Sequence, residues 1–428
     1  MKRLLLIAIL VVVSSDAQDN VRFIYDNGFG ARAFSMANNY VALSNDLSAV
    51  YWNPAALSFS LAREFQVSFD VSSLNGDSYF STDQQSSRMN RLKISNAGLM
   101  YSFPATQGGL TIAFAYSNPV VFDDISKINV AFKIYPTDVD LDKSFRTSGG
   151  LKYLSGGLGI QVAPKIGIGA TMSFVYGRED MESTVHWIES QGNLFFDSTE
   201  VYGIKGKYTG YDLRLGAFYK DRLVSAGLRF TFPQFARVTE DDNDKTRISD
   251  SYNKPLEYEI SEKYRAKMYS SYSGAGGISL TLPFLTISAE GRAVFPFSFV
   301  FPSEEIPKSS QAGYFKVGGG LGMEFPVPKM PVLVRAGYSI DEIDLHRFVF
   351  KYGKNKIAWG DDDFNIDKNR HQISAGVVFF SSSMSLDISY GYSMWEISKN
   401  FKYGYNYDGN IKQDYSLHKI MTSLAIRF

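Results

Sequence analysis

The chain has 428 residues, no cysteine, and 44 basic side chains balanced by 44 acidic ones. The absence of cysteine excludes disulfide frameworks, thiol nucleophiles and thiolate metal sites. The charge balance gives no electrostatic basis for nucleic acid binding, so no nucleic acid partner is expected.

The first residues have the pattern of a secretory signal peptide. Lys2 and Arg3 give a positive start, and residues 4–13 form an unbroken apolar run. This run is shorter than the roughly 20 residues that a membrane-spanning helix needs, and small residues just before Gln18 suit cleavage. Residues 1–17 are therefore expected to direct export and to be removed.

Apolar and polar residues alternate with period two through much of the remaining chain. At its end, Ile420, Leu424 and Phe428 fall on one face of a strand, with Ser423 and Arg427 on the other. Such alternation is typical of a wall that faces lipid on one side and a lumen on the other. Beyond the signal peptide, no apolar stretch is long enough for a spanning helix. The sequence predicts an all-β transmembrane barrel in the cell outer membrane of a Gram-negative bacterium.

About fourteen antiparallel strands are expected within residues 64–428. Short turns, such as 163–165 and 220–222, alternate with long polar connections, such as 119–148 and 233–263. Outer-membrane barrels join their strands by short periplasmic turns and long extracellular loops in this way. The connection lengths thus predict which ends of the strands face the cell exterior.

Residues 18–63 do not join the alternation, and they are expected to fill the lumen as a hatch. Turn-forming and apolar residues are mixed in 27–31 and 51–57, as in a compact plug. Glycines on the inward faces of the strands would let a plug approach the wall. These glycines are Gly167, Gly169, Gly227, Gly337 and Gly376.

Residues 30–37, 42–46 and 48–55 resemble the N-terminal hatch of the FadL/TodX family of outer-membrane transporters. Asn53, Pro54 and Ala55 match the Asn-Pro-Ala motif of that family. The resemblance implies a barrel blocked by a hatch, through which hydrophobic compounds such as long-chain fatty acids or aromatic hydrocarbons are taken up. The same signature is similar to that of PorV-type relatives, which implies the alternative of shuttling or anchoring proteins of type IX secretion.

Two sets of side chains are candidates for contact with such a ligand. Aromatic residues in the long loops would form an outer capture surface that buries an alkyl chain at about 0.8 kcal/mol per methylene, or would be loop cores and interface residues. They are Phe122, Phe132, Tyr135, Phe195, Phe196, Phe348 and Phe350. Charges on predicted inward faces would bind a carboxylate head or pair with one another. They are Arg214, Arg229, Glu290, Arg292, Arg335 and Asp387.

The dipeptide Asn118-Pro119 ends the third predicted strand. Proline removes a hydrogen-bond donor from the ladder, so this dipeptide is a candidate wall interruption through which a ligand would leave sideways. An ordinary strand end is the alternative.

No motif indicates an enzyme, a catalytic residue or a cofactor. There is no Gly-x-Ser-x-Gly elbow and no His-Glu-x-x-His metal motif. The glycine pattern at 28–33 lacks a following βαβ unit, and the acidic run at 361–367 lacks the glycine and glutamate of a calcium loop, so no metal is expected. The expected partners are outer-membrane lipid and lipopolysaccharide, a hydrophobic small molecule, and the barrel assembly machinery, which would read the C-terminal strand ending at Phe428.

Overall fold

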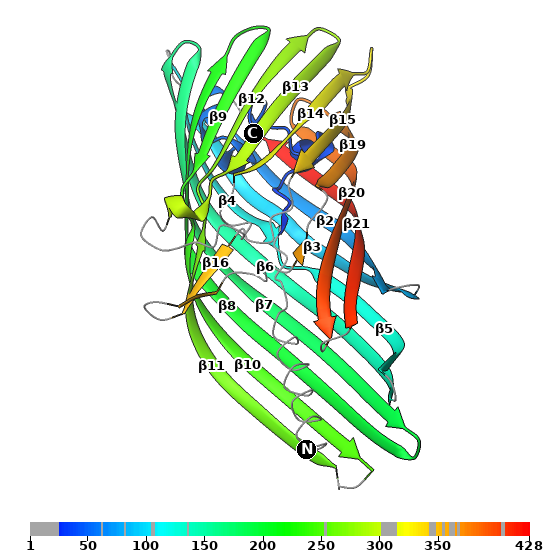
Figure 1. Cartoon of the computed structure of the whole chain (residues 1–428). Coiled ribbons are helices and arrows are strands. Elements are labelled where there is room, and N and C mark those ends of the chain that lie inside the picture. Colours follow the sequence, from blue (N-terminus) through cyan, green and yellow to red (C-terminus); the bar gives the residue numbers. More distant parts are fainter. Residues whose placement is uncertain are drawn as a thin grey trace.

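Fourteen strands close into an antiparallel barrel in the computed structural model of the chain (Figure 1). The structure describes residues 25–60, 63–80, 83–103, 108–134, 137–251, 255–300, 315–341, 348–352, 356–358, 364–365, 369–403 and 407–428. The predicted signal peptide lies outside the described residues. Within the described ranges, no helix is long and apolar enough to span a membrane.

Each wall strand is antiparallel to the next, and the last strand pairs with the first to close the ring. In order around the wall, the strands are β2 (Glu64–Phe80), β3 (Asp83–Phe103), β4 (Leu110–Val121), β6 (Thr137–Ala163), β7 (Ile166–Gln191), β8 (Leu194–Lys220), β9 (Val224–Thr231), β12 (Ser273–Leu282), β13 (Leu285–Val294), β14 (Lys316–Pro326), β15 (Val332–Asp341), β19 (Arg370–Phe380), β20 (Met384–Tyr403) and β21 (Tyr407–Arg427). The all-β barrel and the strand number predicted from the sequence are confirmed.

Further strands pair with strands of the wall or with one another. They are β1 (Tyr25–Asp26), β5 (Asp124–Ile134), β10 (Phe235–Asp250), β11 (Leu256–Ser270), β16 (Phe348–Tyr352), β17 (Lys356–Ala358) and β18 (Phe364–Asn365). A short 3-10 helix, η2 (Phe297–Phe299), follows β13.

Side chains alternate between the outer face of the wall and the lumen. In β8, Leu213 and Leu215 are exposed on the outside, whereas Asp212 and Arg214 are buried on the inside. Successive side chains of a strand point to opposite faces, which produces this separation. The outer face is therefore apolar over the part of the wall nearest the short turns.

Long hairpins extend the ladder far beyond the ends of the shorter strands. Figure 1 shows β6, β7, β8, β10 and β11 continuing past β13, β14 and β15, away from the short turns. We call these two ends the hairpin side and the turn side. The long polar connections predicted at 119–148, 179–202 and 233–263 are thus largely paired strands. Their outer faces carry charges, so apolar alternation could not reveal them, while ladder pairing satisfies their backbone groups.

One edge of β8 is shared by two strands. Residues 214–220 of β8 pair with β9, and residues 196–211 pair with β10. On the next hairpin arm, β11 ends at Ser270 and β12 begins at Ser273. The single strand predicted at 264–281 is therefore divided in two.

Residues 25–60, which we call the N-terminal segment, lie inside the barrel, where Figure 1 draws them in blue. The segment contains β1 and three short helices, α2 (Ala31–Ser35), α3 (Ala49–Trp52) and η1 (Pro54–Phe59). Nearly all its side chains are buried, and η1 packs against β6, β7 and β8 while α2 packs against β19, β20 and β21.

The strand β4 changes its partner near Pro119. Up to Ser117 it pairs with β3, and a register shift against β6 follows between Ser117 and Val120. Val120 and Val121 pair with β1 of the N-terminal segment instead. Since proline has no N–H to donate, it fits this point of departure from β3. The expected end of a strand at Asn118 is therefore an interruption within β4.

Candidate functional site

Glycines of the wall allow the N-terminal segment to lie in close contact with the strands. A Cβ atom at Gly169 would overlap Pro54, and one at Gly337 would overlap the backbone of Met36. Only a residue without a side chain permits such an approach between two backbones. All the glycines predicted to face a plug lie against this segment, and they are Gly167, Gly169, Gly227, Gly337 and Gly376.

The motif of Asn53, Pro54 and Ala55 lies where the segment meets β8. The Oδ1 atom of Asn53 accepts a hydrogen bond from the backbone N–H of Ala55 at 3.1 Å and so caps η1. The Nδ2 atom donates to the carbonyl oxygens of Val41 and of Ala217 in β8, each at 3.1 Å. The buried side-chain amide of Asn53 thus links Val41 and Ala55 of the segment to Ala217 of the wall.

Glu290 of β13 binds the backbone of the segment directly. Its Oε2 atom accepts hydrogen bonds from the N–H groups of Tyr40 at 2.7 Å and Val41 at 2.8 Å. The Nε atom of Arg292 lies 3.2 Å from the other oxygen of Glu290, and the guanidinium also bonds both carboxylate oxygens of Asp341, at 3.0 and 3.1 Å. These predicted lumenal charges are therefore paired internally.

A second charge network lies on the turn side of the segment. Arg335 pairs with Glu324 at 2.6 Å and with Asp387, and Arg32 of the segment lies 3.4 Å from Glu324. Burial lowers and the carboxylate of Glu324 raises the pKa of Arg32, with a net shift upward, so this guanidinium stays charged. The network borders a cavity of about 430 Å³.

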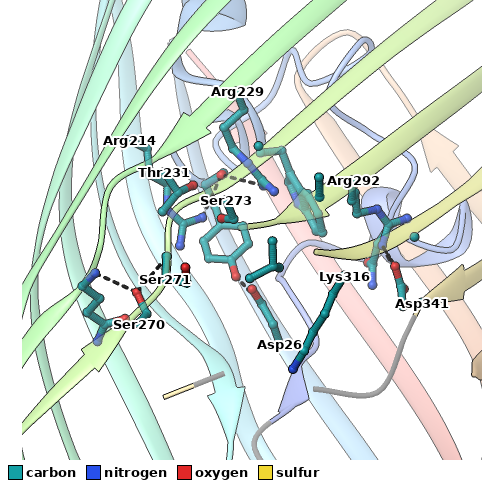
Figure 2. A pocket seen from close by; sticks show the side chains of 18 of the residues that line it. Asp26, Arg214, Arg229, Thr231, Ser270, Ser271, Ser273, Arg292, Lys316 and Asp341 are labelled. Carbon is teal, nitrogen blue, oxygen red and sulfur yellow. Dashed lines mark hydrogen bonds and ion pairs between the residues drawn. The ribbon is translucent and has the colours of Figure 1, made fainter. Parts of the chain in front are cut away.

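A smaller cavity of about 180 Å³ lies on the hairpin side of the segment (Figure 2). Tyr51 and Trp52 of α3 contribute part of its lining, together with the inner faces of several strands. Its basic side chains are Arg214, Arg229, Arg292, Lys316 and Arg370, and its carboxylates are Asp26, Asp212 and Asp341. Basic groups outnumber acidic ones, so the cavity favours an anionic group.

Arg214 and Arg229 both donate to the carbonyl oxygen of Tyr51, at 2.9 and 3.4 Å. Arg214 also pairs with Asp212 at 2.8 Å, and its guanidinium carbon lies 3.7 Å from the centre of the Tyr51 ring. Arg229 forms no ion pair with any described residue, and its buried Nε atom has no hydrogen-bond partner there. Arg229 therefore keeps unused capacity to bind an anion.

An apolar cluster adjoins the cavity at Tyr153, whose hydroxyl group bonds Gln234 at 2.8 Å. Beyond the register shift in β4, Val120 and Phe122 lie against the inner faces of the long strands, and the ring centres of Phe122 and Tyr208 lie 5.3 Å apart. The buried members of this cluster are Val120, Phe122, Leu151, Tyr153, Val175, Tyr208, Ala236, Val238, Ala266 and Met268. A charged cavity and an apolar interior thus lie side by side.

Solved structures share this architecture. TodX, the toluene transporter of Pseudomonas putida, matches with a TM-score of 0.63 and 13% identity over 94% of this chain and 99% of its own. The chain has the TodX fold. A Pseudomonas aeruginosa FadL homologue gives a TM-score of 0.61 at 12% identity over 95% and 100% of the two chains. The toluene transporter TbuX of Ralstonia pickettii gives 0.56 at 14% identity over 94% and 99%. No protein-family model and no curated protein sequence matches the chain.

Within this TodX fold, the predicted capture residues do not share one surface. Phe122 is only 2% exposed and belongs to the apolar cluster. Phe195 and Phe196 lie near the tip of the β7–β8 hairpin, where Phe195 is exposed. The other side chains lie outside the part that the structure describes, although β5 and β16 include the backbone of three of them. They are Phe132, Tyr135, Phe348 and Phe350.

Sequence reasoning missed several lining residues of the 180 Å³ cavity. Lys316 is 6% exposed on the inner face of β14, and Arg370 begins β19. Alternation would have found Lys316, because Val317 is an exposed outer residue and its neighbour must point inward. Nothing in the pattern places Tyr51 and Trp52 against these strands, since they reach the lumen through a segment with no regular period.

Proposed function

We propose that the chain is an outer-membrane channel that takes up hydrophobic small molecules, with residues 18–63 as a hatch in its lumen. The packing of the N-terminal segment carries this proposal, because wall glycines meet the backbone of the segment without intervening space. A lumen obstructed in this way argues against unselective diffusion. The names of the similar structures, which include toluene transporters and a monoaromatic hydrocarbon channel, support the same class.

The cavity favours an amphipathic ligand with a carboxylate head, such as a long-chain fatty acid, over a neutral aromatic hydrocarbon. Arg229 would receive the carboxylate, because this guanidinium has no ion-pair partner among the described residues. The adjoining apolar cluster would open to accept the alkyl chain, with a gain of about 0.8 kcal/mol for each methylene buried. Head and tail would thus meet surfaces of matching chemistry.

The interruption of β4 supports a lateral exit. Beyond Ser117, β4 leaves β3 and pairs with β1 of the N-terminal segment. A movement of the segment would therefore reach the wall at the point where the β3–β4 ladder already ends. This geometry favours passage toward the lipid rather than straight through the lumen.

Uptake in a deletion strain tests the proposal. The strain should lose uptake of labelled oleate, and the wild-type chain should restore it, whereas Arg229→Met should restore little. Unchanged uptake of both oleate and toluene in the deletion strain would sink the transport proposal. If the deletion strain loses toluene uptake but keeps oleate uptake, and the wild-type chain restores toluene uptake, the fatty acid is rejected as the ligand. Copurification with secreted proteins that carry a sorting domain would favour the PorV-like alternative instead.

A further inference from the structure

A basic surface covers the outer face of five neighbouring strands on the hairpin side. All its side chains are exposed. We call it the basic patch, and it consists of Lys152 on β6, Arg178 on β7, Lys205 and Lys207 on β8, Arg237 on β10, and Arg265 and Lys267 on β11.

The strand register makes these side chains neighbours. One row across the ladder contains Lys152, Tyr176, Thr209, Arg237 and Lys267. The next row, two residues further along each strand, contains Gly150, Arg178, Lys207, Thr239 and Arg265. Adjacent strands lie about 4.8 Å apart, so Arg178, Lys207 and Arg237, on three consecutive strands, can approach one small anion.

The patch lacks neutralising carboxylates in its two inner rows. Asp180 and Asp241 lie only in the third row, beside Lys205, and Asp241 is paired with Lys263 at 3.2 Å. The seven patch residues form no ion pair with any residue in the described ranges, although Lys152 lies 6.0 Å from the ring centre of Tyr176. Their charges are therefore available to a partner outside the chain.

The patch begins where the apolar wall ends. The row on its turn side contains Phe174, Tyr211, Phe235 and Tyr269, and exposed apolar residues continue from there toward the short turns. The stretch of β7 from Ile166 to Phe174 matches the roughly 9–11 residues of a bilayer-crossing strand. Aromatic rows mark the bilayer boundary in such barrels. The basic patch thus lies immediately outside the hydrocarbon layer, at headgroup level.

The opposite flank of the barrel carries different charges at its hairpin side. A row beyond the aromatic residues of β20 contains Glu396, Asp414 and Asp77, on β20, β21 and β2. Lys412 pairs with Glu396 and Asp414 at 3.2 Å each. This row is therefore acidic, in contrast to the basic patch.

We propose that the basic patch binds the phosphate groups of lipopolysaccharide in the outer leaflet. This inference rests on the proposed outer-membrane location, with the hairpins outside the cell. Arginine presents a planar fork that binds phosphate in a bidentate manner, and lysine adds point charges. The lipid would lie with its acyl chains against the apolar wall of β7 and β8 and its phosphates over Arg178, Lys207 and Arg237.

Native mass spectrometry of the full-length chain in detergent tests this site. The probes are deep-rough lipopolysaccharide, which is lipid A with the inner core, and the same material after enzymatic removal of its phosphates. The patch variant combines Lys207→Ser, Arg237→Ser and Arg265→Ser. We expect it to bind the phosphorylated probe about a hundredfold more weakly than wild type, because each basic side chain near an anionic surface contributes about tenfold or less.

The control variant combines Lys133→Ser, Lys245→Ser and Arg247→Ser, which removes the same charge from exposed hairpin positions that pair with carboxylates. It should bind like wild type. An equal loss in the control, or undiminished binding by the patch variant, overturns the proposal. Wild-type binding that survives removal of the phosphates also overturns it, and this comparison decides the matter even where the patch variant does not fold.

Two further measurements separate the source of the phosphate and the dependence on transport. Equally strong binding to phosphatidylglycerol vesicles would reject lipopolysaccharide as the specific partner. The patch variant should retain oleate uptake, since the patch faces away from the lumen. Normal uptake in the deletion strain, together with phosphate-dependent lipopolysaccharide binding by the purified wild-type chain, would reject the transport function and support the lipid site.

Discussion

The two ends of the lumen are built from different kinds of contact. On the turn side, beside the cavity of about 430 Å³, the N-terminal segment touches wall glycines, such as Gly169 and Gly337, through its backbone. On the hairpin side, side chains such as Arg214 and Arg229 surround a cavity of about 180 Å³. Backbone packing tolerates no added atom, whereas side chains can exchange internal contacts for a ligand. The comparison assigns the two parts of the proposed function to different regions, closure to the first and ligand binding to the second.

The largest expected effect comes from adding one methyl group on the turn side. In Gly337→Ala, the new Cβ atom would overlap the backbone of Met36, so the segment must shift at a cost of about 3 kcal/mol. We expect raised ion conductance in planar bilayers. Gly291→Ala is the matched control, because a Cβ atom there meets nothing within 4 Å. Equal conductance of the two variants would mean that these glycines do not govern closure.

Glu290→Ala is expected to lower the free energy of unfolding by about 2–3 kcal/mol. The substitution leaves the N–H groups of Tyr40 and Val41 without their acceptor. Urea unfolding in detergent should show the loss, and protease should cut the N-terminal segment sooner than in wild type. The control is Glu257→Ala, which removes an exposed partner of Arg247. Wild-type stability of Glu290→Ala would contradict a docking role for this carboxylate.

Asn53→Ala should lower the free energy of unfolding by about 2 kcal/mol. The substitution removes the cap of η1 and two hydrogen bonds to buried carbonyl oxygens. The midpoint of thermal unfolding on a heat-modifiability gel measures the change. Asn90→Ala, at an exposed position of β3, should leave that midpoint unchanged. A shift confined to ligand flux, with no change in the midpoint, would argue that the motif acts in transport rather than in docking.

The smallest effect on stability is expected on the hairpin side. Arg229→Met should change the unfolding free energy little, since no described carboxylate loses a partner. Binding of oleate, followed by fluorescence titration, should weaken about tenfold, which corresponds to about 1.4 kcal/mol. Arg222→Met, in an exposed turn, serves as the control. If Arg229→Met lowers the free energy of unfolding as much as Asn53→Ala does, the proposed difference between the two regions is wrong.

The wall could be predicted because its apolar outer face follows a simple rule, in which every second residue is apolar. The alternation around Leu213 and Leu215 of β8 follows that rule and was readable directly. Past Tyr176 of β7, the outward residues are no longer apolar. The continuing strand with Arg178 and Asp180 therefore resembles a polar loop in the sequence, although it stays paired in the ladder. Beyond this point the apolar residues of the ladder lie on the inner face, as Ala236 and Val238 do, so the outward apolar period ends.

The lumen was only partly predictable for a different reason. Alternation assigned Arg292 and Arg335 to the inner face, and both lie there. Their partners depend on strands far apart in the chain, as in the bond between Arg335 and Asp387, and on a segment without a period. Register and segment docking together select the partners, and a single sequence contains neither.

One hydrogen bond of the N-terminal segment bears on the order of assembly. The N–H of Ala31 donates to the hydroxyl group of Ser423 at 3.0 Å, and Ser423 pairs with Ser68 where β21 meets β2. The docking place for Ala31 is therefore complete only after the first and last strands have joined. The segment precedes every wall strand in the sequence, yet its contact at Ser423 must wait for the last strand. Ring closure and lumen filling thus become one cooperative event at the seam.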